Sequence, residues 1–215
     1  KNMFEQELLN AQLQRLGKSY KTFYEKSNTL KPGQRIVDNL KEVLKNNLSV
    51  LVYNFVDMMS HSRTDSDMMK ELASDESAYL SLTKSWFQHS DLKVLLSEAS
   101  KHNVKVVITT DHGAIRVQNP IKVIGDKATS TNLRYKLGKS LNYNPKEVFE
   151  VRKPEEAHLP KQNVSSSFIF AYNNAFIAYP NNYNYYVNYY KNTFQHGGIS
   201  LEEMIVPFVV LSPIE

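Results

Sequence analysis

The chain has 215 residues, of which 41% are hydrophobic and 22% charged, and its formal net charge is +4. The length and composition are those of a globular protein with a sizeable core. The absence of cysteine excludes a disulfide scaffold and a cysteine-based zinc finger, and it fits the cytoplasmic location that we expect. The sequence contains no run of about 18 apolar residues, so no membrane span is expected. The modest positive charge favours anionic ligands but is too small to predict a nucleic-acid-binding stripe.

The amino end begins Lys-Asn-Met-Phe-Glu-Gln-Glu, which is neither an initiator methionine nor a signal peptide, so we interpret it as a cut inside a longer protein. Apolar residues at helical spacing predict a helix over residues 4–16, with Gly17 as its C-cap. A short strand is predicted at 20–24, and a second helix from Pro32 to about residue 46.

Two strongly apolar strands are predicted, at residues 48–56 and 104–110, and the second is rich in β-branched residues. Such a run is typical of a strand buried on both faces at the centre of a sheet. Residues 65–102 between them are predicted to be helical, with a possible break at Ser90-Asp91. A strand, helix and strand in this order predict two parallel strands whose polar carboxyl ends meet at one edge of the sheet.

Past Gly113 the pattern changes to short strands separated by Pro, Gly and Asn turns. Residues 168–171 and 175–179 are predicted to form a hairpin. Ser200 followed by Glu203 is a capping box that predicts a short helix, and a closing strand is expected at 208–211.

The candidate metal ligands lie at the predicted strand ends. Asp57 and His61 stand on one face of a helical turn, Asp111 and His112 follow the second strand, and His196 precedes two glycines. Carboxylate oxygens and imidazole nitrogens are ligands that zinc accepts. Together they suffice for two adjacent zinc-type ions, which suit in-line displacement at phosphorus.

Each residue also has a plainer interpretation. Asp57 could be an N-cap, His61 a surface residue, His196 a loop residue bonded to backbone, and Asp111-His112-Gly113 an ordinary turn. The joint occurrence of all five at one predicted edge favours the metal site. The remaining histidines are predicted to be structural or solvent-facing: His89, His102 and His158.

The segment between the second strand and His196 could form a cap. Residues 172–190 are rich in tyrosine and asparagine, and Arg134 with Lys136 could hold a phosphate. We expect residues 114–192 to form an inserted β-rich cap with Arg134 as the phosphate contact, which would favour nucleotide-like phosphodiesters. The alternative is that the tyrosines pack a β subdomain and Arg134 forms a surface salt bridge.

The order Asp57-x-x-x-His61, Asp111-His112-Gly113 and a late His196 resembles the metal-ligand order of the alkaline phosphatase superfamily. The ending HGGISLEEMIVP resembles its PglZ-domain branch. The motifs NFVDMMSH, TTDHGAIRVQNP, TNLRY, YPNNYNYYVNYY and NTFQHGGISLEEMIVP are similar to PglZ-domain response regulators of type IX secretion, over essentially the whole chain. The resemblance implies an α/β fold whose sheet is sandwiched by helices, with an inserted cap and an incomplete amino end.

The resemblance further implies one zinc ion on Asp57, His61 and His196, and a second on Asp111 and His112. Residues 1–47 contain no apolar strand that ends in Asp followed by Ser or Thr. The nucleophile and one ligand are therefore expected upstream of Lys1, with a receiver domain further upstream. On this interpretation residues 1–215 are the carboxyl-terminal part of one PglZ domain and contain no catalytic nucleophile.

The function implied is a zinc-dependent phosphoesterase, acting on a nucleotide-like phosphate ester as the effector of a two-component response regulator. Its partners would be the receiver domain and a sensor kinase. A sheet edge exposed in this part of the domain would favour a dimer or a swapped assembly, and this part alone is expected to be inactive. Two alternatives stay open: a metal-stabilised module that binds protein or DNA without catalysis, and a lyase or mutase on the same scaffold.

Overall fold

The structure is a computed structural model of residues 1–215, and it describes residues 4–27, 36–72, 75–126, 129–161 and 163–213. The side chains of residues 61–65, 67 and 70 are outside this description. The chain divides into two compact units. The first comprises residues 1–59, 68–107 and 210–215, and the second comprises residues 60–67 and 108–209.

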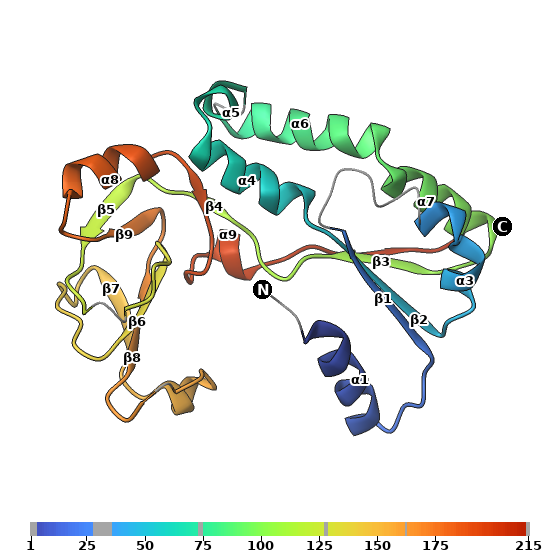
Figure 1. Cartoon of the computed structure of the whole chain (residues 1–215), viewed down its shortest axis with the longest axis horizontal. Coiled ribbons are helices and arrows are strands. Elements are labelled where there is room, and N and C mark those ends of the chain that lie inside the picture. The colour runs from blue at the N-terminus through green and yellow to red at the C-terminus, as the bar shows by residue number, and fades with distance from the viewer. Residues whose placement is uncertain (1–3, 28–35, 73–74, 127–128, 162, 214–215) are drawn as a thin grey trace. The chain divides into compact units, whose positions relative to one another are not determined.

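The first unit is mostly helical around one pair of strands. Strands β1 and β2 pair in parallel, with Thr22 opposite Leu48 and Ser27 opposite Tyr53. The elements that lie wholly or mostly in this unit are shown in Figure 1: α1 (Glu5–Arg15), β1 (Thr22–Ser27), α3 (Leu40–Leu44), β2 (Leu48–Tyr53), α5 (Asp67–Leu72), α6 (Glu76–His89) and α7 (Asp91–Lys101). Helix α4 (Phe55–Asp65) and strand β3 (Val106–Thr109) cross from one unit to the other.

The core of the first unit lies between this strand pair and helices α3 and α7. Its buried members are Ile36, Leu40, Val43 and Leu95, and the half-buried side chains packed on them are Phe23, Leu44, Leu51 and Leu92. The ring of Trp86, from α6, stacks on Phe55 at a centroid distance of 4.5 Å and meets Tyr53 edge-on at 6.2 Å. Aromatic packing therefore fixes α6 against the junction of β2 and α4.

Most local predictions in this unit are confirmed. Helix α1 ends before Gly17, whose φ of +67° is the left-handed conformation expected of a C-cap glycine. The predicted break at Ser90 is present, because Ser90 is extended (φ −87°, ψ 156°) between α6 and α7. The predicted helix at 32–46 is confirmed in part: residues 36–38 and α3 are helical with a turn at Asn39 between them, and residues 32–35 lie outside the described residues.

The prediction of a buried central strand at 104–110 is wrong for the described structure. Strand β3 pairs with β11 (Phe208–Leu211), whereas β2 pairs with β1, so the two apolar strands do not share a described sheet. Val107 and Ile108 of β3 are 48% and 36% exposed. A β-branched run favours an extended backbone, but burial depends on layers supplied by distant segments, which the run does not encode.

The second unit is built from small sheets. The antiparallel order is β6 (Tyr135–Gly138), β8 (Ser167–Ala171) and β7 (Val148–Val151). Strand β5 (Asn119–Lys122) pairs in parallel with β9 (Ala175–Ala178), and β4 (Ile115–Arg116) pairs antiparallel with β10 (Phe194–Gln195). The helical elements are η1 (Pro154–Ala157), α8 (Tyr183–Tyr190) and α9 (Leu201–Met204).

The predicted hairpin of residues 168–171 and 175–179 is wrong. The chain does turn tightly, since Ala175 N donates to Tyr172 O and Asn173 has a positive φ of 41°. Strand β8 nevertheless pairs with β6 and β7, and β9 pairs with β5. The turn redirects the chain into a second sheet because other strands supply the partners on both sides.

Two apolar clusters hold this unit together. One joins β5, β7, β8 and β9, and its buried members are Ile121, Val123, Val148, Ile169, Ala171 and Ile177. The other packs α8 on β4 and β9, with Ile115, Val117, Phe176 and Ala178 buried. Among the described residues, no helix is long and apolar enough to cross a membrane.

Candidate functional site

His112 lies in the turn that follows β3, and its surroundings fix its backbone. Thr110 Oγ1 donates to the His112 carbonyl at 3.0 Å, and Gly113 N donates to Glu203 O at 2.9 Å. A Cβ atom at position 113 would lie 1.9 Å from Glu202 O, so only glycine fits between this turn and α9.

The His112 ring is oriented for ligation by one nitrogen. Nδ1 lies 3.0 Å from Gly113 O, and a carbonyl oxygen can only accept a hydrogen bond. The contact therefore assigns a proton to Nδ1, and in the neutral ring this leaves the lone pair on Nε2. Metal-binding histidines commonly have their second nitrogen hydrogen-bonded in this way, which fixes both tautomer and ring orientation.

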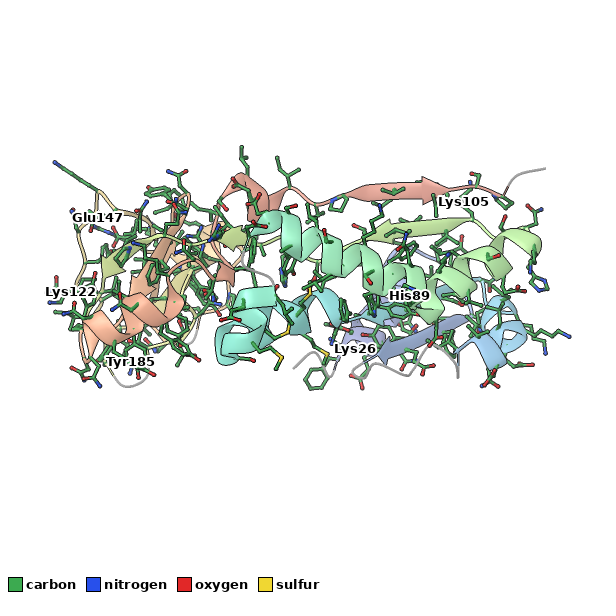
Figure 2. The ribbon with its side chains drawn as sticks, turned by 90° about the horizontal axis from the view of Figure 1, so that it is seen from above. Lys26, His89, Lys105, Lys122, Glu147 and Tyr185 are labelled. Carbon is green, nitrogen blue, oxygen red and sulfur yellow. The ribbon has the colours of Figure 1, made fainter. Side chains whose placement is uncertain are left out.

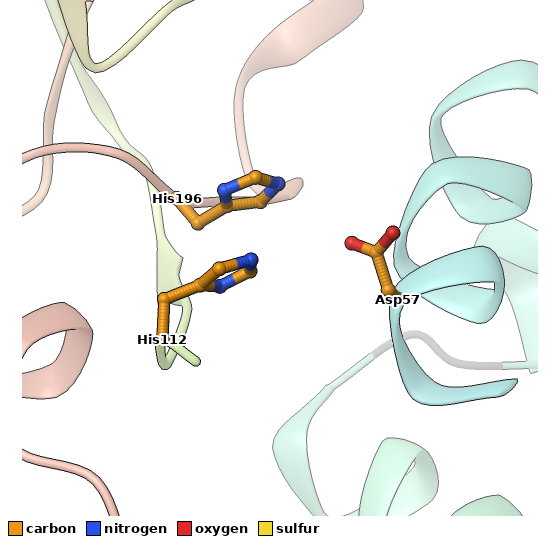
Figure 3. Close-up of side chains that lie close together, drawn as sticks. All are labelled: Asp57, His112 and His196. Carbon is orange, nitrogen blue, oxygen red and sulfur yellow. The ribbon is translucent and has the colours of Figure 1, made fainter. Parts of the chain in front are cut away.

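His196 is brought against His112 from the other end of the unit. Its ring is stacked on that of His112 at a centroid distance of 4.0 Å and an interplanar angle of 12°, as Figure 3 shows. Both side chains are half-buried. Each offers one ring nitrogen, and these two nitrogens lie within 4.8 Å of each other. Two imidazole nitrogens at that separation are close enough to contact one ion.

Asp57 and His61 both lie on α4, four residues apart. Asp57 stands in the first turn of this helix with its side chain exposed, and it belongs to the first unit. His61 lies further along the same helix, but its side chain is outside the described residues. The predicted helical spacing is thus confirmed for the backbone. Their ligation of a metal stays a prediction.

Asp111 is beside the histidine pair and open to solvent. Its side chain is 76% exposed, and Oδ1 lies 3.8 Å from His112 Nε2. This contact would be an ion pair only if the imidazole were protonated. An exposed carboxylate next to an imidazole is available as a further oxygen ligand.

Arg134 has contacts that do not fit the predicted phosphate contact. Arg134 is 0% exposed. Its guanidinium donates hydrogen bonds to both carboxylate oxygens of Glu203 and to the carbonyl oxygens of Ala171 and Ala175. All of these acceptors belong to the protein. Arg134 is therefore unavailable to a phosphate in this structure. It does form a salt bridge, but the pair is buried and not on the surface as the alternative expected.

Glu203 is a residue of the site that sequence reasoning did not select. Burial alone would raise the pKa of Glu203, but hydrogen bonds from Arg134, Ser200 and Gly198, together with the charge of Arg134, lower it below its ordinary value. The only signal in the sequence was the capping box, which is confirmed: Glu203 Oε2 accepts from Ser200 N and Oγ.

The other three histidines do not belong to this cluster. His89, labelled in Figure 2, is exposed at the end of α6, and its Nδ1 lies 2.8 Å from Ser85 O. His102 and His158 are also exposed. The prediction that these three are structural or solvent-facing is confirmed.

Comparison with known families gives a match over nearly the whole length. Residues 4–211 match the BREX system PglZ alkaline phosphatase-like domain. The chain belongs to the PglZ family. A comparison with curated proteins returned no match.

Membership of the PglZ family gives the site its chemical context. An alkaline phosphatase-like domain indicates phosphoesterase-type activity, and the stacked histidines with Asp111 beside them are residue types suited to a metal ion. The mixed α/β architecture with several small sheets is consistent with an alkaline-phosphatase-like fold.

Proposed function

We propose that this PglZ domain is a zinc-dependent phosphoesterase. The observation that carries the proposal is the His112–His196 pair, in which Nδ1 of His112 is committed to a backbone carbonyl and Nε2 is left for a ligand. Two stacked imidazoles whose ring nitrogens lie within 4.8 Å of each other are close enough to bind one ion.

The proposed ligands extend beyond the pair. The family resemblance implies one ion on Asp57, His61 and His196 and a second on Asp111 and His112, and this assignment is the one proposed. Zinc bound there would supply a Lewis acid that polarises a phosphoryl oxygen. The chain itself orients the His112 imidazole, through the contact of its Nδ1 with Gly113 O.

We further propose that residues 114–192 form a cap that contacts the part of the substrate beyond the phosphate. Helix α8 supports this, because its tyrosines form two stacked pairs, Tyr185 with Tyr189 and Tyr186 with Tyr190. Tyr185, labelled in Figure 2, is 63% exposed. Exposed phenol rings can stack on nucleobases, so a nucleotide-like phosphodiester is the favoured substrate class.

The physiological setting is inferred from resemblance alone. The motifs around Asp57, His112, Arg134 and His196 are similar to those of PorX, the PglZ-domain response regulator of type IX secretion. We therefore propose that the domain is the effector of a two-component system, with a receiver domain and a sensor kinase as partners.

The test is a paired measurement on the full-length protein. Zinc content is determined by elemental analysis after dialysis, and turnover is measured with a chromogenic phosphate diester and the matching monoester. Zinc binding with diester turnover, both abolished by His112→Ala, supports the proposal. Zinc binding without turnover of either ester identifies a metal-stabilised interaction module instead, and absence of zinc binding refutes the metal site.

A further inference from the structure

Both histidine-bearing turns of the site converge on one short helix, α9, and all three segments belong to the second unit. The turn of His112 is held from one side: Gly113 N donates to the backbone oxygen of Glu203 at 2.9 Å. The clash that any side chain at position 113 would make with Glu202 O shows how closely this turn lies against the helix.

The turn of His196 is held from the other side by the carboxylate of the same residue. Gly198 N donates to Glu203 Oε1 at 2.9 Å, and this hydrogen bond is buried. A Cβ atom at position 198 would lie 2.8 Å from Glu203 Oε2 and 2.7 Å from Arg134 Nη2. Gly197 has a φ of +102°, a conformation that other residues rarely adopt. The loop can therefore approach Glu203 only because it has no side chains there.

Arg134 fixes the carboxylate that fixes this loop. Nε donates to Oε1 at 2.8 Å and Nη2 donates to Oε2 at 2.7 Å, so the plane of the carboxylate is set by the plane of the guanidinium. The segment around Arg134 also reaches the histidine turn directly. Asn132 Oδ1 accepts from Arg134 N at 2.7 Å, and Asn132 Nδ2 donates to His196 O at 3.4 Å.

A buried ion pair is not explained by stability alone. The cost of removing two charges from water can match their attraction, and apolar replacements often fold as well. What the pair provides here is a defined position. It fixes one residue, Glu203, which contacts the turn of His112 through its main chain and the turn of His196 through its side chain.

We propose that Glu203, oriented by Arg134, is a positioning residue that sets the His112 and His196 rings against each other. The consequence for metal binding rests on the proposed function, but the positioning itself does not require a metal. A residue that orients ligands typically changes metal affinity by about 10- to 100-fold when it is replaced.

The experiment uses the full-length protein with selectively labelled histidine. Ring-to-ring nuclear Overhauser contacts between His112 and His196 are measured without metal, and zinc affinity is measured by calorimetry. The variants are Glu203→Ala, Glu203→Gln and Arg134→Lys. The matched control is Val148→Ala, which removes packing from the buried apolar cluster of the same unit but no hydrogen-bonding side chain of the ion pair.

We expect the ring contact to weaken or disappear in Glu203→Ala, with zinc affinity at least about 10-fold lower, while Val148→Ala keeps both. Glu203→Gln retains the shape but presents an amide NH₂ to donors, so its affinity should lie between the two. Arg134→Lys keeps the charge and loses the two-pronged fork, and it should also be intermediate. If Glu203→Ala does not fold, these two conservative variants still test whether Glu203 positions the two imidazole rings.

A folded Glu203→Gln or Arg134→Lys protein with the ring contact and zinc affinity of wild type would overturn the proposal. An equal loss in Val148→Ala would also overturn it, because the effect would then follow from stability alone. If wild type binds no zinc but the ring contact still depends on Glu203, positioning stands and the metal-binding function fails.

Discussion

Arg134 and Glu203 form a two-pronged ion pair in which the side chains are 0% and 1% exposed. The two residues are 69 positions apart in the sequence, so their hydrogen bonds connect the start of β6 to α9. Because α9 also accepts a hydrogen bond from the turn of His112, this pair links the sheet of the second unit to the candidate metal ligands.

Breaking this pair should be costly. Arg134→Ala leaves a buried carboxylate without its counter-charge, and we expect a loss of about 3–5 kcal/mol in unfolding free energy. Denaturant titration followed by circular dichroism measures it. The matched control is Lys153→Ala, which removes an ion pair with Glu156 whose partners are both 68% exposed, and that change should cost less than about 1 kcal/mol. Equal effects of the two substitutions would contradict the structural role of the buried pair.

Acid should weaken the second unit through Glu203. Its folded pKa is lowered, so its contribution to stability is complete above the ordinary value of 4.5 and is lost as the pH falls through the folded pKa. Between about pH 6 and pH 3 wild type should therefore lose more stability than Glu203→Gln does. Thermal melts over this range test the prediction, and parallel pH curves for the two proteins would refute it.

Lys136 should make stability increase with pH in the alkaline range. Burial lowers the pKa of Lys136 from 10.5 to about 8. At lower pH, protonated Lys136 therefore costs the folded state more free energy than it costs the unfolded state. Wild type should gain on the order of 2 kcal/mol relative to Lys136→Met as the pH rises from about 8 to 10. Lys139→Met, at an exposed position nearby, controls for the loss of one positive charge. A pH-independent difference between wild type and Lys136→Met would show that this ammonium is not desolvated.

Gly113 should tolerate no side chain. In Gly113→Ala the new Cβ would meet a backbone oxygen at 1.9 Å, so either the turn of His112 or α9 must move. We expect both lower stability and weaker zinc binding. Gly17→Ala is the contrast: it has a positive φ but open space around it, so it should cost about 1 kcal/mol and leave zinc binding unchanged. Zinc affinity retained in Gly113→Ala would show that the position of this turn does not matter for the site.

Metal binding should depend on two histidines from opposite ends of the unit. His112→Ala and His196→Ala should each remove most of the thermal stabilisation that zinc confers on the chelator-treated protein, whereas His89→Ala should not. A ligand present at 100 times its dissociation constant stabilises the folded state by about 2.7 kcal/mol, which is readily measured by thermal melts. Undiminished stabilisation in His196→Ala would exclude the stacked pair as the binding site.

The sequence by itself determined the features that a few neighbouring residues encode. The glycine after α1, the break at Ser90 and the capping box before α9 were predictable because each rests on local hydrogen bonds and backbone preferences. The residue types at 57, 61, 111, 112 and 196 also predicted a metal site, because Asp and His are ligands that zinc accepts, and this ligand set stays a prediction.

Only the tertiary structure decided which distant segments meet. Strand β8 pairs with β6 and β7 and not with β9, and β3 pairs with β11. These partners come from distant parts of the chain, and the hydrophobic periodicity of a strand does not indicate which distant strand it will pair with. From the sequence alone, Arg134 was predicted to contact phosphate. In the structure it is a buried partner of Glu203, a carboxylate 69 residues further along the chain. A guanidinium binds carboxylate and phosphate by the same two-pronged contact, so the identity of its partner depends on the fold and not on the motif.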